Sequence, residues 1–195
     1  MTTVIIGHGV SPLKKGWGRE IDKHTVVRMK DPSWQNEFDY GTRIDYLSAS
    51  TEVMHSMLLT KKNPKEYWCQ PKKGEWDTAA EVDFRQKSKD RAPMLILEEP
   101  FYTWNKKYLD MRPDPTAQLG FRNFSLGTFT ILTVLDRLKE TDVRLVGFDN
   151  LMEPDLWEYH KGDRGIWKSW HDWHTEKGML PLFEDHYGAT ITEWR

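Results

Sequence analysis

Residues 3–29, TVIIGHGVSPLKKGWGREIDKHTVVRM, carry the strongest signal for the fold of this chain. The stretch begins with a β-branched apolar run that ends at Gly7, and a second apolar run follows at 25–29 after a polar, glycine-containing connection. Continuous apolar runs bounded by turn residues are typical of strands buried on both faces of a parallel sheet. The stretch therefore predicts two such strands, with a short helix at 13–21 between them.

The same alternation continues along the chain. Further strands are predicted at 43–48, 94–97, 143–148 and 190–194, and helices at 52–59, 125–138 and 167–183. Two stretches lack a clear period: 61–91 is predicted as loops and short helices, and 100–115 as irregular chain. Alternating strands and helices predict an α/β fold, a single domain over residues 1–195 with a mostly parallel central sheet and helices on both faces.

Composition places the chain among ordinary globular proteins. It has 195 residues, of which 38% are hydrophobic and 30% charged, and a formal net charge of −2. That charge argues against a general electrostatic affinity for nucleic acid, although the lysine pairs at 61–62 and 72–73 allow a local basic patch. Cys69 is the only cysteine, which excludes an intramolecular disulfide, and the apolar run at 4–6 is too short for a signal peptide or a membrane span. We therefore expect a cytoplasmic protein without a membrane span.

The residues that follow the predicted strands are the first candidates for a site, because ligands of open parallel sheets bind outside the carboxyl ends of the strands. Gly7, His8 and Gly9 follow the first strand. Glycines in such a turn let a phosphate approach backbone N–H groups. The turn matches neither the dinucleotide fingerprint nor the P-loop, so a purely structural turn is the alternative. Lys30 and Asp149 follow two further strands and belong to the same candidate edge.

The clearest helix begins with Ser125, Leu126, Gly127 and Thr128. Ser125 is a plausible N-cap residue. A helix N-terminus has unpaired N–H groups and a partial positive charge, which suit a phosphate or a carboxylate. Simple capping of the helix is the alternative interpretation.

A histidine-rich segment near the C-terminus carries the candidate base. It reads HDWHTE from His171 to Glu176. Histidine titrates near neutral pH and therefore suits general base catalysis. The spacing does not match the H-E-x-x-H zinc motif, but His160, His171 and His174 leave a metal site as an alternative.

In order and spacing, these segments resemble the animal-type sialyltransferases, the family defined by short sialylmotifs. The large motif is matched over the first part of the chain by Gly18, Glu20, Ile21, Asp22, Val26, Arg28, Asp39, Gly41 and Arg43. The small motif is similar to GFRNFSLG at 120–127 together with VRLVGFD at 143–149. The very short motif, H-D-x-x-x-E, is matched by His171, Asp172 and Glu176, and the third motif by Tyr159 and His160.

The resemblance implies both a fold and a reaction. The fold is a variant of the nucleotide-sugar-binding (GT-A-like) sandwich. The reaction is the transfer of a sugar, either sialic acid or another sugar, from a CMP-linked donor to a hydroxyl group of a glycan or another acceptor. The transfer inverts the anomeric centre and needs neither a metal ion nor a cofactor. By analogy with the family, His171 is the catalytic base, His160 faces the donor phosphate or carboxylate, and Glu176 supports the site. The donor-binding candidates are Gly7, His8, Gly9, Lys30, Ser125, Leu126, Gly127, Thr128 and Asp149.

Two positions depart from the family pattern. His8 and Lys30 stand where the family has asparagines that touch the nucleotide. A lysine at this place can pair with a phosphate, which leaves the donor base and sugar open. The family's cysteine pair, membrane anchor and stem find no match, so we expect a short bacterial or phage-type relative.

Three other functions stay open. The acceptor can instead be a hydroxymethylated base of phage DNA, an idea that rests on the basic stretches between residues 61 and 91. A non-catalytic nucleotide-sugar-binding module would account for the two departures, whereas His171 and Glu176 argue against it. A metal-dependent hydrolase would use the histidine cluster.

Overall fold

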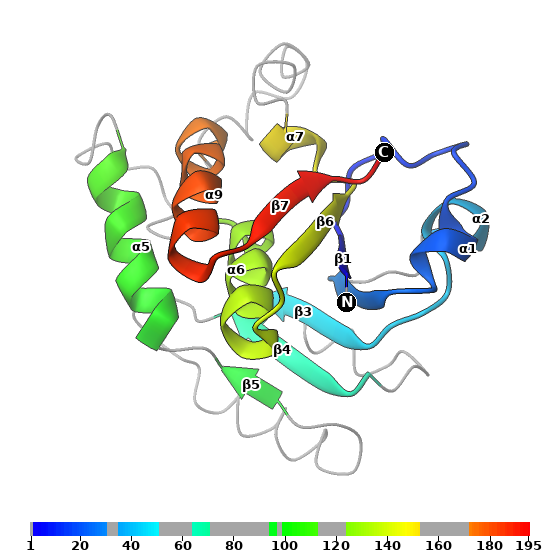
Figure 1. Cartoon of the computed structure of the whole chain (residues 1–195), viewed down its shortest axis with the longest axis horizontal. Coiled ribbons are helices and arrows are strands. Elements are labelled where there is room, and N and C mark those ends of the chain that lie inside the picture. Colours follow the sequence, from blue (N-terminus) through cyan, green and yellow to red (C-terminus); the bar gives the residue numbers. More distant parts are fainter. Residues whose placement is uncertain are drawn as a thin grey trace.

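The structure is a computed structural model, and it describes residues 2–30, 35–50, 64–70, 94–96, 99–112, 124–152 and 172–195. In this part of the chain, seven strands form one sheet in the order β5-β4-β3-β2-β1-β6-β7, and each neighbouring pair is parallel (Figure 1). The strands are β1 (Thr3–Ile6), β2 (Thr25–Met29), β3 (Tyr46–Ser50), β4 (Glu66–Gln70), β5 (Met94–Ile96), β6 (Asp142–Val146) and β7 (Thr190–Glu193). The predicted parallel α/β sheet is confirmed.

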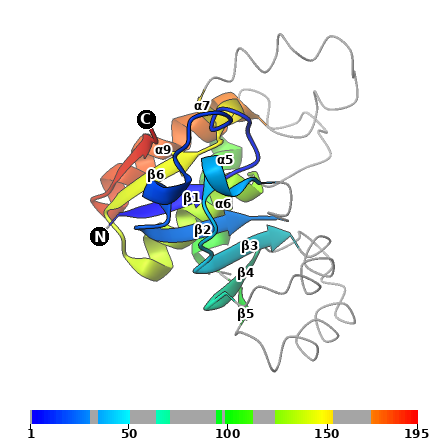
Figure 2. The same ribbon diagram turned by 90° about the vertical axis from the view of Figure 1, so that its right-hand side faces the viewer.

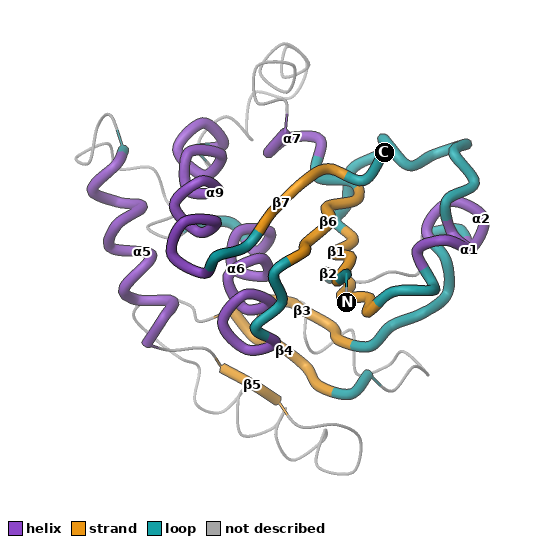
Figure 3. Tube along the Cα trace, in the orientation of Figure 1, coloured by secondary structure: helices purple, strands orange, loops and turns teal. Residues whose placement is uncertain are grey.

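Helices cover both faces of this sheet, as the sequence predicts. The described helices are α1 (Gly18–Ile21), α2 (Glu37–Tyr40), α5 (Glu99–Met111), α6 (Leu126–Thr133) with its π-helical continuation η1 (Val134–Leu138), α7 (Asp149–Met152) and α9 (Trp173–Tyr187). Figure 3 shows α5, α6 and α9 on one side of the strands and the short helices α1 and α2 on the other. None of the helices in the described ranges has the length and apolar character needed to cross a membrane.

The core has two parts because successive residues of a strand point to opposite faces of the sheet. In β1, Ile5 packs in the larger cluster, with Phe129 of α6 and Phe183 of α9. Its neighbours Val4 and Ile6 pack in the smaller cluster, which includes Ile21, Val26, Tyr40 and Val146 and is flanked by Trp17 and Trp194. The continuous apolar run of β1 is therefore explained by burial on both faces.

Two predicted elements differ from the structure. Residues 66–70, within a stretch predicted as loops and short helices, form the inner strand β4. Residues 99–111, predicted to be irregular, form the helix α5, whose second residue is Pro100. Proline is tolerated in the first turn of a helix, where its missing N–H would have no internal acceptor. The predicted helix at 52–59 lies outside the described residues.

The order of the strands places a topological switch point between β1 and β6. From β1 the chain builds outward through β2, β3, β4 and β5, and it then returns to the other side of β1 to form β6 and β7. Figure 2 shows the strands one below another, from β6 through β1 down to β5. Ligands of such folds bind outside the carboxyl ends of the strands at the switch point. We call this rim of the sheet the carboxyl edge.

Several residues that match the large motif hold α1 against α2. A Cβ atom at Gly18 would lie 2.0 Å from the carbonyl oxygen of Glu37, so only glycine allows this approach. The carboxylate of Asp22 accepts hydrogen bonds from the N–H groups of Thr42 and Arg43, at 2.8 Å each for the shorter contacts. In the same region, the N–H of Gly16 donates to Asp39 and holds the pKa of that carboxyl below its usual value.

Arg28 of β2 connects this packing to the turn that follows β1. Its side chain is buried, with 1% of its surface exposed, and donates to the carbonyl oxygens of Tyr40 and Gly41 at 2.8 and 2.9 Å. It also donates to the side-chain oxygen of Gln35, whose amide donates to the carbonyl of Gly7 at 2.9 Å. Burial lowers the pKa of Arg28 to about 10, so the guanidinium stays charged at neutral pH.

Replacing Gly18 should destabilise the fold. The added methyl group of Gly18→Ala would collide with backbone rather than with a flexible side chain, so we expect the free energy of unfolding to fall by about 2 kcal/mol or more. Urea denaturation followed by circular dichroism measures the change. Gly178→Ala, in the interior of α9, is the matched control because its new methyl group would meet only the end of the Met111 side chain, at 3.3 Å. This control should leave stability unchanged or raise it by up to about 1 kcal/mol, and equal losses for both variants would contradict the packing argument.

Candidate functional site

The turn after β1 is shaped by its contact with the end of β6. The N–H of Gly7 donates to the carbonyl of Val146 at 2.8 Å, and the N–H of Gly9 donates to that of Gly147 at 2.7 Å. A Cβ atom at Gly7 would lie 2.5 Å from the Gly147 oxygen. Gly147 itself has a φ of +68°, a backbone angle that residues with a side chain rarely adopt. These glycines therefore serve the close approach of two strand ends at the switch point.

Asp149, which follows β6, holds the outer part of this turn. Its Oδ2 atom accepts hydrogen bonds from the N–H groups of Val10 and Ser11, at 2.7 and 3.1 Å. The other oxygen, Oδ1, is buried and has no hydrogen-bond donor among the described residues. A Cβ atom at Gly9 would lie 2.4 Å from that Oδ1 atom. Asp149 thus occupies backbone donors that an anionic ligand would otherwise approach.

Tyr40 closes the turn from the α2 side. Its hydroxyl donates to the carbonyl of Gly9 at 3.0 Å. Burial, with the nearby charge of Asp149, raises the pKa of Tyr40 to about 12, so the hydroxyl stays protonated and remains a donor. The turn is thereby fixed from both neighbouring elements.

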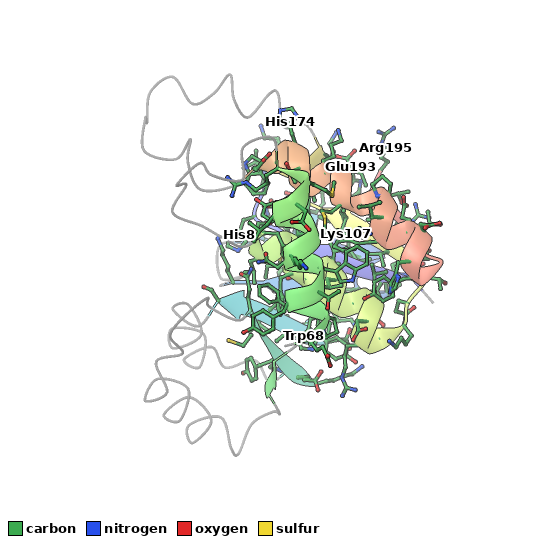
Figure 4. All side chains as sticks on the ribbon, turned by 90° about the vertical axis from the view of Figure 1, so that its left-hand side faces the viewer. His8, Trp68, Lys107, His174, Glu193 and Arg195 are labelled. Carbon is green, nitrogen blue, oxygen red and sulfur yellow. The ribbon has the colours of Figure 1, made fainter. Side chains whose placement is uncertain are left out.

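His8 and Lys30 lie side by side at the carboxyl edge. The Nε2 atom of His8 is 2.9 Å from the carbonyl oxygen of Met29, the residue before Lys30. Both side chains are exposed. Figure 4 shows His8 where β1 ends and His174 at the start of α9. The two departures from the family pattern therefore share one place in the fold.

A second polar cluster lies at the start of α6. Ser125 is the N-cap residue, as predicted, and its hydroxyl accepts from the N–H of Thr128 at 3.3 Å. The carboxylate of Glu176 on α9 accepts from the N–H of Ser125 at 2.9 Å, and from the hydroxyls of Ser125 and Thr128 at 2.5 Å each. All three residues are buried, and Glu176 is 0% exposed. The carboxylate of Glu176 already stands where a ligand anion was predicted for Ser125 and Thr128.

Leu126 and Gly127 differ from Ser125 and Thr128, whose hydroxyls donate to Glu176. They are the first two residues of α6, and an α-helix leaves the N–H groups of its first residues without an internal acceptor. Gly127 packs against the ring of Phe148, to which an added Cβ atom would come within 3.0 Å. The backbone N–H groups of this pair are thus the donors at the start of α6 that suit an anion.

The start of α6 is also held from α5 and β4. The N–H of Phe124 donates to the side-chain oxygen of Asn105 at 3.1 Å, and the side-chain amide of Gln70 donates to the Phe124 carbonyl at 2.8 Å. Asn105 and Tyr108 lie three positions apart on α5 and therefore on one face of that helix, and Arg112 follows four positions later, directly after the helix ends. Sequence reasoning missed these residues. Their spacing is the signal that could have found them, had a helix been predicted there.

The start of α9 is defined by Asp172. This residue is the N-cap, and its carboxylate accepts from the N–H and the hydroxyl of Thr175, at 3.0 and 2.7 Å. The guanidinium of Arg112, with 8% of the residue exposed, lies 3.9 Å from the Asp172 carboxylate. Burial, together with the negative charge of Glu176, raises the pKa of Tyr108 above its ordinary value. His171 precedes this cap by one position.

The predicted site residues fall into three groups. Gly7, His8, Gly9, Lys30 and Asp149 come together at the carboxyl edge. The second group is the cluster at the start of α6 that contains Glu176. His160 and His171, and the lysine pairs at 61–62 and 72–73, lie outside the described residues. Within the described ranges, no group of three metal-ligating side chains is found.

Among comparisons with known proteins, only those with solved structures found a match, and they concern the fold. No model of a known protein family matches the sequence, and no curated protein is detectably similar to it in sequence. The structure is similar to the monofunctional alpha-2,3-sialyltransferase Cst-I from Campylobacter jejuni, with a TM-score of 0.65 and 16% identity over 98% of this chain and 74% of that one.

Two further solved structures are also similar, with slightly lower TM-scores. The sialyltransferase CstII from Campylobacter jejuni, in complex with the substrate analogue CMP, has a TM-score of 0.63 and 12% identity, covering 98% of this chain and 79% of that one. The sialyltransferase CST-II in complex with trisaccharide acceptor and CMP has a TM-score of 0.59 and 14% identity, over 99% of this chain and 80% of that one. The chain therefore has a sialyltransferase-like fold. The sequence resemblance was to the animal-type family, whereas the similar structures found are bacterial.

Replacing Glu176 should loosen the contact between α6 and α9. Glu176→Gln keeps the size of the side chain but puts an amide N–H group where two hydroxyls now donate. We expect the free energy of unfolding to fall by about 2 kcal/mol, measured by urea denaturation.

Asp185→Asn is the matched control on the same helix, because Asp185 is exposed. It should shift the unfolding midpoint very little. If Glu176→Gln unfolds at the same urea concentration as the wild type, the carboxylate is not what holds the two helices together.

Proposed function

We propose that this chain is a glycosyltransferase that moves a sugar from a nucleotide-activated donor to an acceptor hydroxyl. The observation that carries the proposal is the likeness to sialyltransferases over 98% of the chain, combined with motif-like segments that follow strands β1, β2 and β6. A fold by itself does not define a reaction. The candidate groups at the carboxyl edge are what make this reaction the best supported one.

The donor would lie across the switch point. The N–H groups of Leu126 and Gly127, with the partial positive charge of a helix N-terminus, suit its phosphate. The turn of Gly7, His8 and Gly9 would form the adjoining wall. In this proposal Ser125, Thr128 and Asp149 act on the donor indirectly, because their polar groups already hold the start of α6 and the turn in place.

The chemistry needs a base and a stabilised leaving group. His171 would take the proton of the acceptor hydroxyl while that oxygen attacks the anomeric carbon. The bond from that carbon to the donor phosphate breaks, and the nucleotide leaves with the electron pair. Attack opposite the leaving group inverts the anomeric centre. Helix N–H groups and His160 would stabilise the negative charge on the leaving phosphate, so the scheme needs no metal ion.

CMP-sialic acid is the first donor to test. The similar proteins are named as sialyltransferases, and two of their structures hold CMP, one of them with a trisaccharide acceptor. For this chain we therefore propose a CMP-linked sugar as donor and a glycan hydroxyl as acceptor. No described residue favours a DNA acceptor.

The base assignment can be tested by donor hydrolysis. Glycosyltransferases of this kind should hydrolyse their donor slowly without an acceptor, because water can replace the hydroxyl. His171→Ala should lower this rate by about 100-fold or more while nucleotide binding, measured by calorimetry, stays the same. An unchanged rate in the variant would refute the base assignment.

Two controls separate the remaining alternatives. His174→Ala changes an exposed histidine three positions further along and should keep most of the hydrolysis. Full activity in the presence of a chelator is expected for a metal-independent transferase and would exclude the hydrolase. Nucleotide binding without any turnover would instead indicate a non-catalytic module.

A further inference from the structure

The carboxyl edge carries two basic side chains directly after the neighbouring strands β1 and β2. In the parallel pairing of β1 with β2, Ile6 lies opposite Arg28. His8 and Lys30 stand two residues beyond these paired positions, after the strands have ended. The Nε2 atom of His8 lies 2.9 Å from the carbonyl oxygen of Met29, which holds the ring of His8 beside the end of β2. Both side chains therefore face one small part of the edge, beside the switch point.

The backbone at Lys30 is unusual. Its φ is +51°, in the left-handed region that residues other than glycine and asparagine rarely adopt. The N–H of Lys30 nevertheless donates to the carbonyl of Ser48 at 2.8 Å, so the pairing with β3 fixes this conformation. Two other described lysines have a similar φ. Lys14, at +67°, lies in a turn whose N–H groups donate to the Asp39 carboxylate. Lys139, at +55°, caps the end of η1, where left-handed residues are common. Lys30 has no such helix to end, and backbone strain of this kind tends to occur at functional sites.

Lys30 also differs from three other lysines in its charge environment. Lys23, Lys65 and Lys139 each have an acidic partner within 4.0 Å. Among the described residues, Lys30 has no ion-pair partner. The side chain is exposed at the surface, yet protein atoms packed around the ammonium desolvate it and lower its pKa. A desolvated cation without a counter-ion is unfavourable, and an anionic ligand would relieve that cost.

Among the described residues that follow a strand at this edge, the acidic side chain is that of Asp149, on the other side of β1. Asp149 follows β6, and its Oδ2 atom is already bound by two backbone N–H groups. The edge is thus basic beside β2 and acidic beside β6. As far as the described residues go, an anionic ligand group is favoured on the β2 side.

We propose that Lys30, with His8 beside it, binds an anionic group of the donor that is additional to the phosphate held at the start of α6. This inference rests on the proposed function and names the donor class: either a nucleoside diphosphate-linked sugar or a monophosphate-linked sugar that carries a carboxylate. The ammonium of lysine is a compact charge that suits either group. A neutral sugar on a single phosphate would leave the ammonium of Lys30 without a counter-ion among the described residues.

The experiment compares ligand pairs that differ by one anionic group. Isothermal titration calorimetry is run with CMP, CDP and CMP-sialic acid, and with the mono- and diphosphates of uridine, adenosine and guanosine. The proteins are the wild type, Lys30→Asn and Lys139→Asn. Asparagine tolerates the left-handed backbone, so both variants should melt at the wild-type temperature. Lys139 lies before β6, at the opposite edge of the sheet, and its variant removes the same charge from the same kind of backbone.

The expected result is a ratio of affinities. In the wild type, the ligand with the second anionic group should bind about tenfold or more tightly than the matched monophosphate. Lys30→Asn should remove this preference, and Lys139→Asn should keep it. A preference for CDP or another diphosphate identifies a second phosphate, and a preference for CMP-sialic acid identifies a carboxylate.

Other results would overturn the inference. The inference fails if the wild type binds the monophosphate and the ligand with the second anionic group with affinities within about threefold of each other. It also fails if Lys30→Asn keeps the preference for the second anionic group, or if Lys139→Asn loses that preference to the same extent as Lys30→Asn. Such results leave the proposed transferase intact, since monophosphates would still bind and His171 would still be required for turnover. If no nucleotide binds the wild type, the proposed function itself fails.

Discussion

The buried carboxylate of Glu176 fixes the arrangement on which the rest of the candidate site depends. It accepts hydrogen bonds from the backbone and hydroxyl of Ser125 and from the hydroxyl of Thr128. A buried carboxylate without such donors would be very unfavourable, so α9 can pack here only with its first turns against the start of α6. The position of Asp172, the N-cap residue of α9, follows from this contact.

The residues that match the large motif mainly build the scaffold. Gly18 permits the approach of α1 to α2, Asp22 binds the backbone after α2, and Arg28 connects β2 to the turn after β1. The two departures, His8 and Lys30, lie instead at the carboxyl edge. A motif match carried by scaffold residues is strong evidence for a fold and weaker evidence for a ligand. This agrees with structural neighbours that share the fold at only 12–16% identity.

The turn after β1 has a similar division of roles. Asp149 and Tyr40 hold it from opposite sides, through the backbone of residues 9–11. Because these polar groups are engaged within the protein, Lys30 remains at this edge as a charged side chain that has no ion-pair partner among the described residues, and His8 lies beside it. The chemical character of the edge is therefore set by the residues that the family pattern does not share.

Local signals in the sequence were enough to predict the central part of this structure. The apolar runs at 3–7, 25–29 and 143–148 predicted the three central strands, and Ser125 was correctly predicted as the N-cap of α6. Such signals are local, because a strand buried on both faces must be apolar throughout and a cap must accept from an N–H three residues later. The order of the strands along the chain also predicted that Gly7, His8, Lys30 and Asp149 share one edge of a parallel sheet.

Which groups remain for a ligand depends on tertiary packing. β4 and α5 were missed, because a short strand inside a charged stretch and a helix that begins with Glu-Pro have weak local signals. The partner of Glu176 lies 51 residues away in the chain, and that of Asp149 lies 139 residues away. No pattern along the chain encodes such contacts, because they arise only when packing brings distant elements together and buried polar groups must find donors.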